Sequence, residues 1–284
     1  MINKNTKFLI VGLGLIGGSY ASSLSQSGYQ VGAIDVNQSS IDFALKNNLI
    51  AHGSTKVQPE YLAQFDVIIF ALYPNQFIQW ITDYQKYLKK DALITDVTGV
   101  KQSVVYKVQS LIDQNKEFIS AHPMAGKAVS GVQNASSQIF KGANYIITPT
   151  NKNTQNAIET SKELASILGF EKVSVISPEE HDEIIGFLSQ LTHCIAVSLM
   201  NCEHKIELAD FTGDSFRDLT RIANINDVMW SELFLLNKET LVEQIDKFSA
   251  TLEQFKNYIK NEDVSGMRQM MQKSTMERKR FDKK

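Results

Sequence analysis

The chain has 284 residues, of which 43% are hydrophobic, and a net charge of −2 from 29 basic and 31 acidic side chains. This balance excludes a strongly basic nucleic-acid-binding surface and an acidic tail, so we predict no nucleic-acid partner. The two cysteines, Cys194 and Cys202, form no C-x-x-C pair. We therefore predict no metal site, no disulfide framework and a reducing, cytoplasmic location.

The first motif along the chain is a glycine-rich turn between a predicted strand, 8–11, and a predicted helix. Its glycines have the spacing G-x-G-x-x-G, which is typical of a dinucleotide site. The first glycine allows a tight turn, the second lets main chain approach a pyrophosphate, and the third lets the helix pack on the strand. N–H groups at the helix start face the phosphates. The residues predicted to bind the cofactor here are Gly12, Gly14, Leu15, Ile16 and Gly17.

Asp35 ends the second predicted strand, 18 residues after Gly17. There its carboxylate can accept hydrogen bonds from the adenosine ribose. The same charge would repel the 2′-phosphate of NADP, and residues 36–40 contain no Arg or Lys to neutralise it. We therefore predict NAD as the cofactor, although Asp35 also suits a cap on the following helix. Lys4 and Lys7 before an apolar run resemble a signal peptide, but the glycines and the second strand disfavour that interpretation.

Strands alternate with helices through the first half of the chain, which predicts an α/β fold with a Rossmann-type, doubly wound parallel sheet. After the glycine motif the predicted helices are 39–47, 74–88, 101–114 and 154–168, and the predicted strands lie near 52 and at 66–72, 92–96, 118–121, 144–149 and 171–176. We expect the last two strands to extend the same sheet. From Pro178 onward the periodicity is helical only, so we predict a nucleotide-binding domain over 1–177 and an all-helical domain over 178–284.

Residues 184–202 form an apolar stretch without Asp, Glu, Lys or Arg that is long enough to cross a bilayer. Its polar side chains would be costly facing lipid; they are Ser189, Gln190, Thr192, His193, Ser198 and Asn201. We predict a buried core helix that takes part in a subunit interface, and no membrane partner.

Ligands of open parallel sheets bind beyond the carboxyl ends of the strands. The loops that meet this condition are 71–75, 96–101 and 122–126. Leu72 and Tyr73 in the first loop are predicted to contact the cofactor. His122 begins the third loop, and an imidazole there can take the proton of an alcohol that loses hydride. A histidine that only bonds main chain at a strand end is an equally open interpretation.

Residues 120–126, Ser-Ala-His-Pro-Met-Ala-Gly, resemble the prephenate dehydrogenase family of tyrosine biosynthesis. Further segments agree in the same order along nearly the whole chain; they are 130–131, 96–101, 180–193 and 216–230. The resemblance implies a Rossmann domain, a helical dimerisation domain and hence a homodimer. It also implies NAD-dependent oxidative decarboxylation of prephenate, a cyclohexadienol with a ring carboxylate, to 4-hydroxyphenylpyruvate.

The same resemblance assigns roles to particular residues. His122 matches the family's catalytic histidine, and Arg221 matches the arginine that holds a substrate carboxylate, which a guanidinium grips through two parallel hydrogen bonds. Asp218 lies three residues before Arg221 and would orient it, unless the two form only a surface pair. His181 and His193 match histidines near the family's active site, and Gln190 lies three residues before His193 on the same helical face. For His193 and Gln190 a structural hydrogen bond is an open alternative to substrate contact.

Two departures from the family bear on activity and specificity. Gly99 stands where many relatives carry a serine that positions the catalytic histidine, and we expect Thr98 or a water to replace that hydroxyl. Lys127 and Ala128 stand where relatives often have a polar–acidic pair beside the substrate side chain. A cation there favours a keto-acid carboxylate over an ammonium group, so we predict prephenate rather than arogenate as the substrate.

Two further hypotheses stay open at this point. A two-domain imine or β-hydroxy-acid reductase would use a lysine or aspartate on the later helices instead of His122. A catalytically inactive NAD-binding regulator would account for Gly99, since motifs alone do not establish activity.

Overall fold

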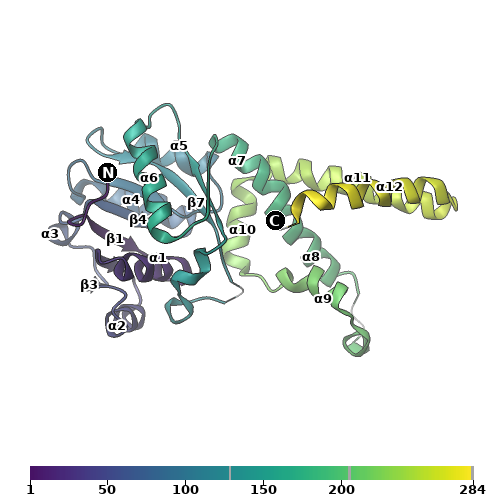
Figure 1. The fold of residues 1–284 in the computed structure, drawn as a ribbon, viewed down its shortest axis with the longest axis horizontal. Coiled ribbons are helices and arrows are strands. Elements are labelled where there is room, and N and C mark those ends of the chain that lie inside the picture. The colour runs from purple at the N-terminus through teal and green to yellow at the C-terminus, as the bar shows by residue number, and fades with distance from the viewer. Residues whose placement is uncertain (128, 204–205, 283–284) are drawn as a thin grey trace. The chain divides into compact units, whose positions relative to one another are not determined.

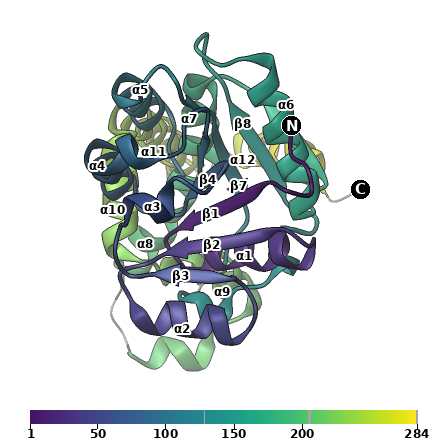
Figure 2. The ribbon, with the colours of Figure 1, turned by 90° about the vertical axis from the view of Figure 1, so that its left-hand side faces the viewer.

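The computed structural model describes residues 1–127, 129–203 and 206–282, so Ala128 lies outside the described residues. A parallel sheet of six strands, in the order β3-β2-β1-β4-β5-β6, is the centre of the first half (Figures 1 and 2). Its strands are β1 (Lys7–Val11), β2 (Gln30–Ile34), β3 (His52–Ser54), β4 (Val67–Phe70), β5 (Leu93–Asp96) and β6 (Glu117–Phe118). Strand order reverses beside β1, and the predicted doubly wound sheet is confirmed. The carboxyl ends of β1 and β4 therefore border the crevice where such sheets bind ligands.

Helices cover both faces of this sheet, because successive side chains of a buried strand point to opposite faces. Phe8 and Ile10 of β1 pack on one side and Leu9 and Val11 on the other, and all four are buried. The helices packed on the first side are α1 (Leu15–Gln26), α2 (Gln38–Lys46) and α6 (Gln155–Leu168). Those on the second side are α3 (Pro59–Leu62), α4 (Pro74–Tyr84) and α5 (Gln102–Leu111).

A second, three-stranded sheet contains β7 (Ser120–Met124), β8 (Asn144–Thr148) and β9 (Lys172–Val175). The prediction that 144–149 and 171–176 extend the first sheet is therefore wrong. β7 runs antiparallel to β8, with His122 opposite Ile146. An apolar run identifies a strand but fixes neither its partner nor its direction, which is why the sequence pattern missed this sheet. His122 accordingly lies within β7 rather than in a loop after a strand.

The described residues after Pro178 contain helices and turns without a strand, as predicted. In this region α7 (Pro178–Ile185) continues through a π-helical turn (Gly186–Leu191) into α8 (Thr192–Met200), followed by α9 (Asp214–Thr220), α10 (Asp227–Leu236), α11 (Lys238–Lys260) and α12 (Val264–Arg278). Short 3-10 turns occupy Gln85–Tyr87, Val132–Asn134, Ser137–Phe140, Ile206–Phe211, Arg221–Ala223 and Lys279–Phe281.

Contacts divide the chain into a unit Met1–Asn237 and a unit Lys238–Lys284. The first unit includes α10 because Leu233 is buried in the same hydrophobic cluster as Phe77 of α4. The second unit consists of α11, α12 and the final turn. The domain boundary predicted at 177/178 stays a prediction.

The apolar stretch 184–202 is not a buried core helix within this chain alone, and its predicted place in a subunit interface stays a prediction. Among the described residues, Pro178–Met200 passes a test of length and hydropathy for a membrane span, yet only 28% of its apolar window is buried. Phe187, Leu188 and Met200 are exposed. A helix that is apolar on all sides does not show whether the residues that bury it belong to its own chain or to another chain.

Candidate active site

The glycine turn lies over the carboxyl end of β1 and has room for glycine alone at two positions. Gly12 has a φ of 98°, and a Cβ there would lie 2.5 Å from the carbonyl oxygen of Ala71. At Gly17 a Cβ would lie 1.9 Å from the carbonyl oxygen of Gly12. At Gly14, by contrast, a Cβ would meet nothing within 4 Å. No side chain caps α1 at this residue, so its first N–H groups face open space that suits a phosphate.

Three of the other predicted cofactor residues, Leu15, Ile16 and Leu72, border this turn, and Tyr73 follows Leu72. Leu15 and Ile16 are the first residues of α1. A Cβ on Gly12 would come within 2.9 Å of a methyl carbon of Leu72, so Leu72 lies against the turn. The Tyr73 hydroxyl accepts a hydrogen bond from the side chain of Asn226 at 2.9 Å. These positions are consistent with a cofactor site, and the individual roles stay predictions.

Asp35 directly follows β2 and is tied to the glycine turn. Its Oδ2 accepts a hydrogen bond from Leu13 N at 2.5 Å, and its Oδ1 accepts one from Asn37 N at 2.8 Å. The side chain that caps α2 is Asn37, so the capping role considered for Asp35 is wrong. The carboxylate is thereby held at the edge of the turn, where a ribose hydroxyl would reach it.

His122 is half-buried and forms a line of polar contacts with two buried residues of α7. Its Nδ1 lies 2.8 Å from Nε2 of His181, and Nδ1 of His181 lies 2.7 Å from Oδ1 of Asp182. The contact is with a side chain, which does not fit the alternative of a histidine bonded only to main chain. The opposite edge of the ring faces the loop after β5, where a Cβ on Gly99 would lie 3.9 Å from Nε2.

Both rings favour the neutral state. Burial, followed by the nearby His181 and Lys101, lowers the pKa of His122 well below its usual value. Burial also lowers the pKa of His181, although its hydrogen bond to Asp182 acts in the opposite direction. His122 can therefore accept a proton at neutral pH, as a general base must.

A fully buried ion pair supports the strand that carries His122. The Lys101 ammonium donates to Asp96 Oδ2 at 2.8 Å, to the Ala121 carbonyl at 2.7 Å and to Thr98 Oγ1 at 3.2 Å. Asp96 Oδ1 accepts a hydrogen bond from the Ser120 hydroxyl at 2.5 Å. These contacts join β5, the following loop and β7. Sequence reasoning missed the network, since nothing in the spacing of 96–101 shows that the lysine side chain turns inward.

The Thr98 hydroxyl, predicted to replace the family's serine, has partners within its own loop. Its hydroxyl is buried, contacts the Asp96 carboxylate and lies 2.9 Å from the Val100 carbonyl. These contacts favour a structural position for Thr98, and its predicted catalytic role stays a prediction. A Cβ at Gly99 would be 3.5 Å from the nearest Leu233 carbon, an ordinary contact. What this chain lacks at Gly99 is a side chain with a hydroxyl, although a Cβ would fit there.

The predicted substrate residue His193 lies beside Trp230 and near Arg221. The rings of His193 and Trp230 are stacked with centroids 3.8 Å apart. Burial and the charge of Arg221 lower the pKa of His193, against its 2.8 Å contact with the Ser189 carbonyl. Trp230 and Leu233 are nearly one turn apart on α10. This helix therefore contacts His193 through Trp230 and lies close to Gly99 through Leu233.

Gln190 is buried among other elements of the fold. It donates to the Leu233 carbonyl at 3.0 Å and accepts from Asn237 Nδ2 at 2.7 Å. The amide thus has a partner at each end, which favours the structural alternative, and the predicted contact with substrate stays a prediction. The π-helical turn Gly186–Leu191 directs this side chain inward.

Other predicted groups are not brought together. Among residues 1–127, 129–203 and 206–282, no ion pair joins Asp218 to Arg221, and both are exposed. α9 ends at Thr220, which breaks the helical face that would have aligned them. Nor does any hydrogen bond or ion pair within those ranges join His122 directly to Arg221. Lys127 is exposed after β7.

A glycine turn at the reversal point of a parallel sheet, with a neutral imidazole near the neighbouring strands, defines a nucleotide-dependent dehydrogenase. Family models agree: "Prephenate dehydrogenase, nucleotide-binding domain" matches residues 20–173, and "Prephenate dehydrogenase, dimerization domain" matches 177–273. The chain belongs to the prephenate dehydrogenase family, a family of oxidoreductases.

Individual relatives support this membership over most of their length. The prephenate dehydrogenase of Bacillus subtilis is 30% identical over 266 residues, which are 91% of this chain and 71% of that protein. That of Lactococcus lactis is 31% identical over 260 residues, 87% and 70% of the two chains. A crystal structure of prephenate dehydrogenase from A. aeolicus with hydroxyphenyl propionate and NAD+ is 30% identical, covers 98% of both chains and has a TM-score of 0.89.

Proposed function

We propose that this chain catalyses the NAD-dependent oxidative decarboxylation of prephenate to 4-hydroxyphenylpyruvate, a step of tyrosine biosynthesis. The observation that carries the proposal is the position of His122, whose ring bonds His181 through Nδ1 and presents Nε2 toward the loop after β5. Membership of the family supports the substrate, and the glycine turn supports the cofactor.

The residues around the turn fit NAD. The open space at Gly14 and the uncapped start of α1 would hold the pyrophosphate, and Asp35 would accept hydrogen bonds from the adenosine ribose. When bound, NAD would supply the acceptor for a hydride. No basic side chain follows Asp35 within residues 36–40 to hold a 2′-phosphate, which supports NAD over NADP.

The chain's own residues would then accept the proton of prephenate and bind its carboxylate. His122 Nε2 accepts the proton of the ring hydroxyl while the carbon that bears it loses hydride. The ring carboxylate leaves as carbon dioxide, and aromatisation makes the step irreversible. Arg221 holds a substrate carboxylate, and the stacked rings of His193 and Trp230 form an adjacent wall.

Substitution of Arg221 by alanine is expected to raise KM for prephenate by about 10- to 100-fold, with a smaller change in kcat. The contact with the carboxylate exists both before and during the reaction, so its loss weakens binding in both states. Arg217→Ala is the matched control, because Arg217 pairs with Asp214 on the exposed side of α9. Steady-state kinetics decide the matter: an unchanged KM in Arg221→Ala would remove this residue from the site.

The substrate and the cofactor are tested in one experiment. Purified protein is mixed with prephenate or arogenate and with NAD or NADP, and NADH or NADPH formation is followed by absorbance. We expect the highest kcat/KM with prephenate and NAD, since the exposed Lys127 suits a keto-acid carboxylate. Faster turnover of arogenate would reverse the substrate preference. No turnover with either substrate, together with NAD binding, would support the regulator suggested by Gly99.

We also propose that the chain acts as a homodimer in the cytoplasm. The match of residues 177–273 to a dimerisation domain supports the dimer. The exposed apolar side chains Phe187, Leu188 and Met200 offer a surface for a second copy to cover. Light scattering of the purified protein should give the mass of two chains, and a monomer mass at micromolar concentration would refute the dimer. Cell fractionation tests the location.

A further inference from the structure

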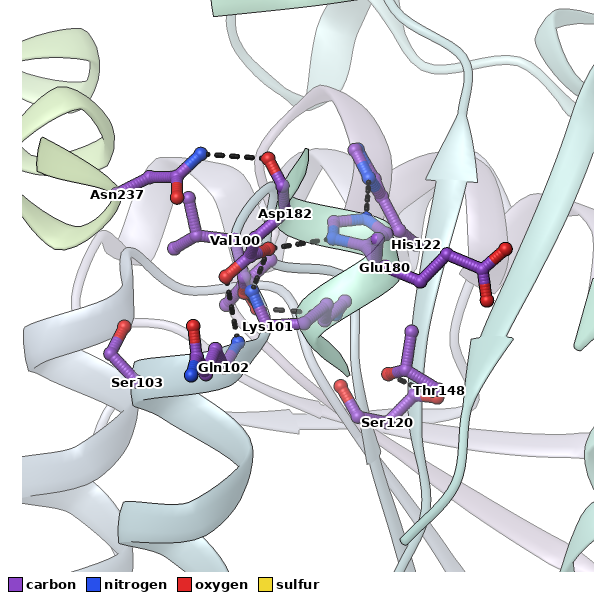
Figure 3. A network of polar contacts seen from close by, with 12 residues as sticks. Val100, Lys101, Gln102, Ser103, Ser120, His122, Thr148, Glu180, Asp182 and Asn237 are labelled. Carbon is purple, nitrogen blue, oxygen red and sulfur yellow. Dashed lines mark hydrogen bonds and ion pairs between the residues drawn. The ribbon is translucent and has the colours of Figure 1, made fainter. Parts of the chain in front are cut away.

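The line His122–His181–Asp182 has one consistent assignment of protons. The Asp182 carboxylate accepts hydrogen bonds from Lys101 N through Oδ1 and from Gln102 N through Oδ2, each at 2.8 Å (Figure 3). It also lies at the start of α5, where the helix dipole favours a negative charge. Asp182 is therefore an acceptor on every side, and the nitrogen of His181 that faces it must carry a proton.

That proton fixes the rest of the line. A neutral His181 with a proton on Nδ1 has a lone pair on Nε2, so the 2.8 Å contact with His122 requires that His122 Nδ1 be the donor. Nε2 of His122 is then left without a proton. This is the tautomer that a general base needs at the atom facing Gly99, whereas a ring free of partners is divided between two tautomers.

The same line persists after proton uptake. Once His122 holds a second proton on Nε2, its Nδ1–H still donates to the lone pair of His181 Nε2. The charge of Lys101 acts on both rings. The charges of Asp182 and Asp96 act on His181. The Lys101 ammonium forms an ion pair with the Asp96 carboxylate at 2.8 Å. The negative charge of Asp96 therefore offsets the positive charge of Lys101 near the rings.

We propose that His181 and Asp182 are positioning residues, which hold His122 in the tautomer with Nδ1 protonated and Nε2 free to take the substrate's proton. This inference rests on the proposed role of His122 as the base. Asn237 completes the arrangement, since its side chain donates to the Asp182 carbonyl at 2.9 Å and so anchors this part of α7 (Figure 3).

The test compares two substitutions at His181 that differ in one contact. In His181→Asn the shorter amide can still donate to Asp182 but does not reach His122, whereas in His181→Gln an amide oxygen can occupy the place of Nε2. We expect His181→Asn to lower kcat by about 10- to 100-fold with little change in KM for prephenate, and His181→Gln to recover most of the loss. Asp182→Asn is less informative, because the same carboxylate caps α5.

The pH profile separates positioning from a structural role. Activity is lost as pH falls through the pKa of His122, because the protonated ring cannot act as a base. Removal of His181 changes the surroundings of the His122 ring, including a neighbour that lowers its pKa, so the acidic limb of kcat should move in His181→Asn. Nitrogen NMR of the histidine rings should show Nε2 of His122 unprotonated in the wild type and partly protonated in the variant.

The outcomes of this experiment are distinguishable from failure of the proposed function. An active His122→Asn enzyme would refute the base itself. An inactive His122→Asn enzyme, with His181→Asn keeping its kcat, acidic limb and ring tautomer, would refute the positioning role alone. A drop in kcat for both His181 variants with an unmoved acidic limb and an unchanged tautomer would also refute it, since that pattern reflects a structural role.

Discussion

Replacement of His122 by asparagine is expected to lower kcat by about 10²- to 10⁴-fold, the range for removal of a general base. Asparagine is close in shape to the half of the ring that bonds His181 but has no basic nitrogen at the position of Nε2. NAD affinity should remain, because the glycine turn and Asp35 do not contact this side chain in the structure. The measurements are NADH formation for kcat and quenching of tryptophan fluorescence for NAD binding.

The matched control is His52→Asn, which changes an exposed histidine on the edge strand β3. It should leave kcat and KM unchanged. Wild-type turnover in His122→Asn would contradict the proposed base and would favour a reductase that uses a lysine or aspartate on the later helices.

The pH dependence of the wild type offers an independent check on His122. Because burial and its neighbours lower the pKa of this ring, its unprotonated form persists below pH 6.5, the ordinary value for histidine. The acidic limb of kcat/KM should therefore lie below that pH, with a plateau through neutrality. A limb centred above pH 7 would show that another group controls the reaction or that the ring is not desolvated.

Replacement of Lys101 by methionine is expected to lower the free energy of unfolding by about 3–5 kcal/mol, the usual effect of removing one partner of a buried ion pair. The side chains of Lys101 and Asp96 are both fully buried and 2.8 Å apart. Methionine fills a similar volume but leaves the Asp96 carboxylate without its counter-charge and removes the ammonium donor from the Ala121 carbonyl. Urea unfolding at pH 7 gives the change from the shifted midpoint.

An exposed ion pair of the same residue types provides the control for this prediction. Lys89 and Asp66 are 2.6 Å apart, but their side chains are 48% and 34% exposed. Lys89→Met should cost less than about 1 kcal/mol, because water screens this pair. Equal losses in the two variants would mean that burial does not distinguish them, contrary to the prediction.

Much of the site's content could be read from the sequence because it depends on local spacing. The glycines at 12, 14 and 17, the following helix and Asp35 belong to one continuous βαβ segment, and the structure places them around one turn. The motif around His122 and the position of Arg221 came from resemblance to a family, which preserves residues along the chain without describing their contacts.

The sequence alone determined the doubly wound sheet, the helical second half and the family. The tertiary structure decided the separate sheet that carries His122, the inward turn of Lys101 and the line from His122 to Asp182. Periodicity and spacing are properties of neighbouring residues, whereas these contacts join segments 59 and 81 positions apart. Which strand pairs with which, and where a buried amide or carboxylate finds its donors, is settled only when the whole chain packs.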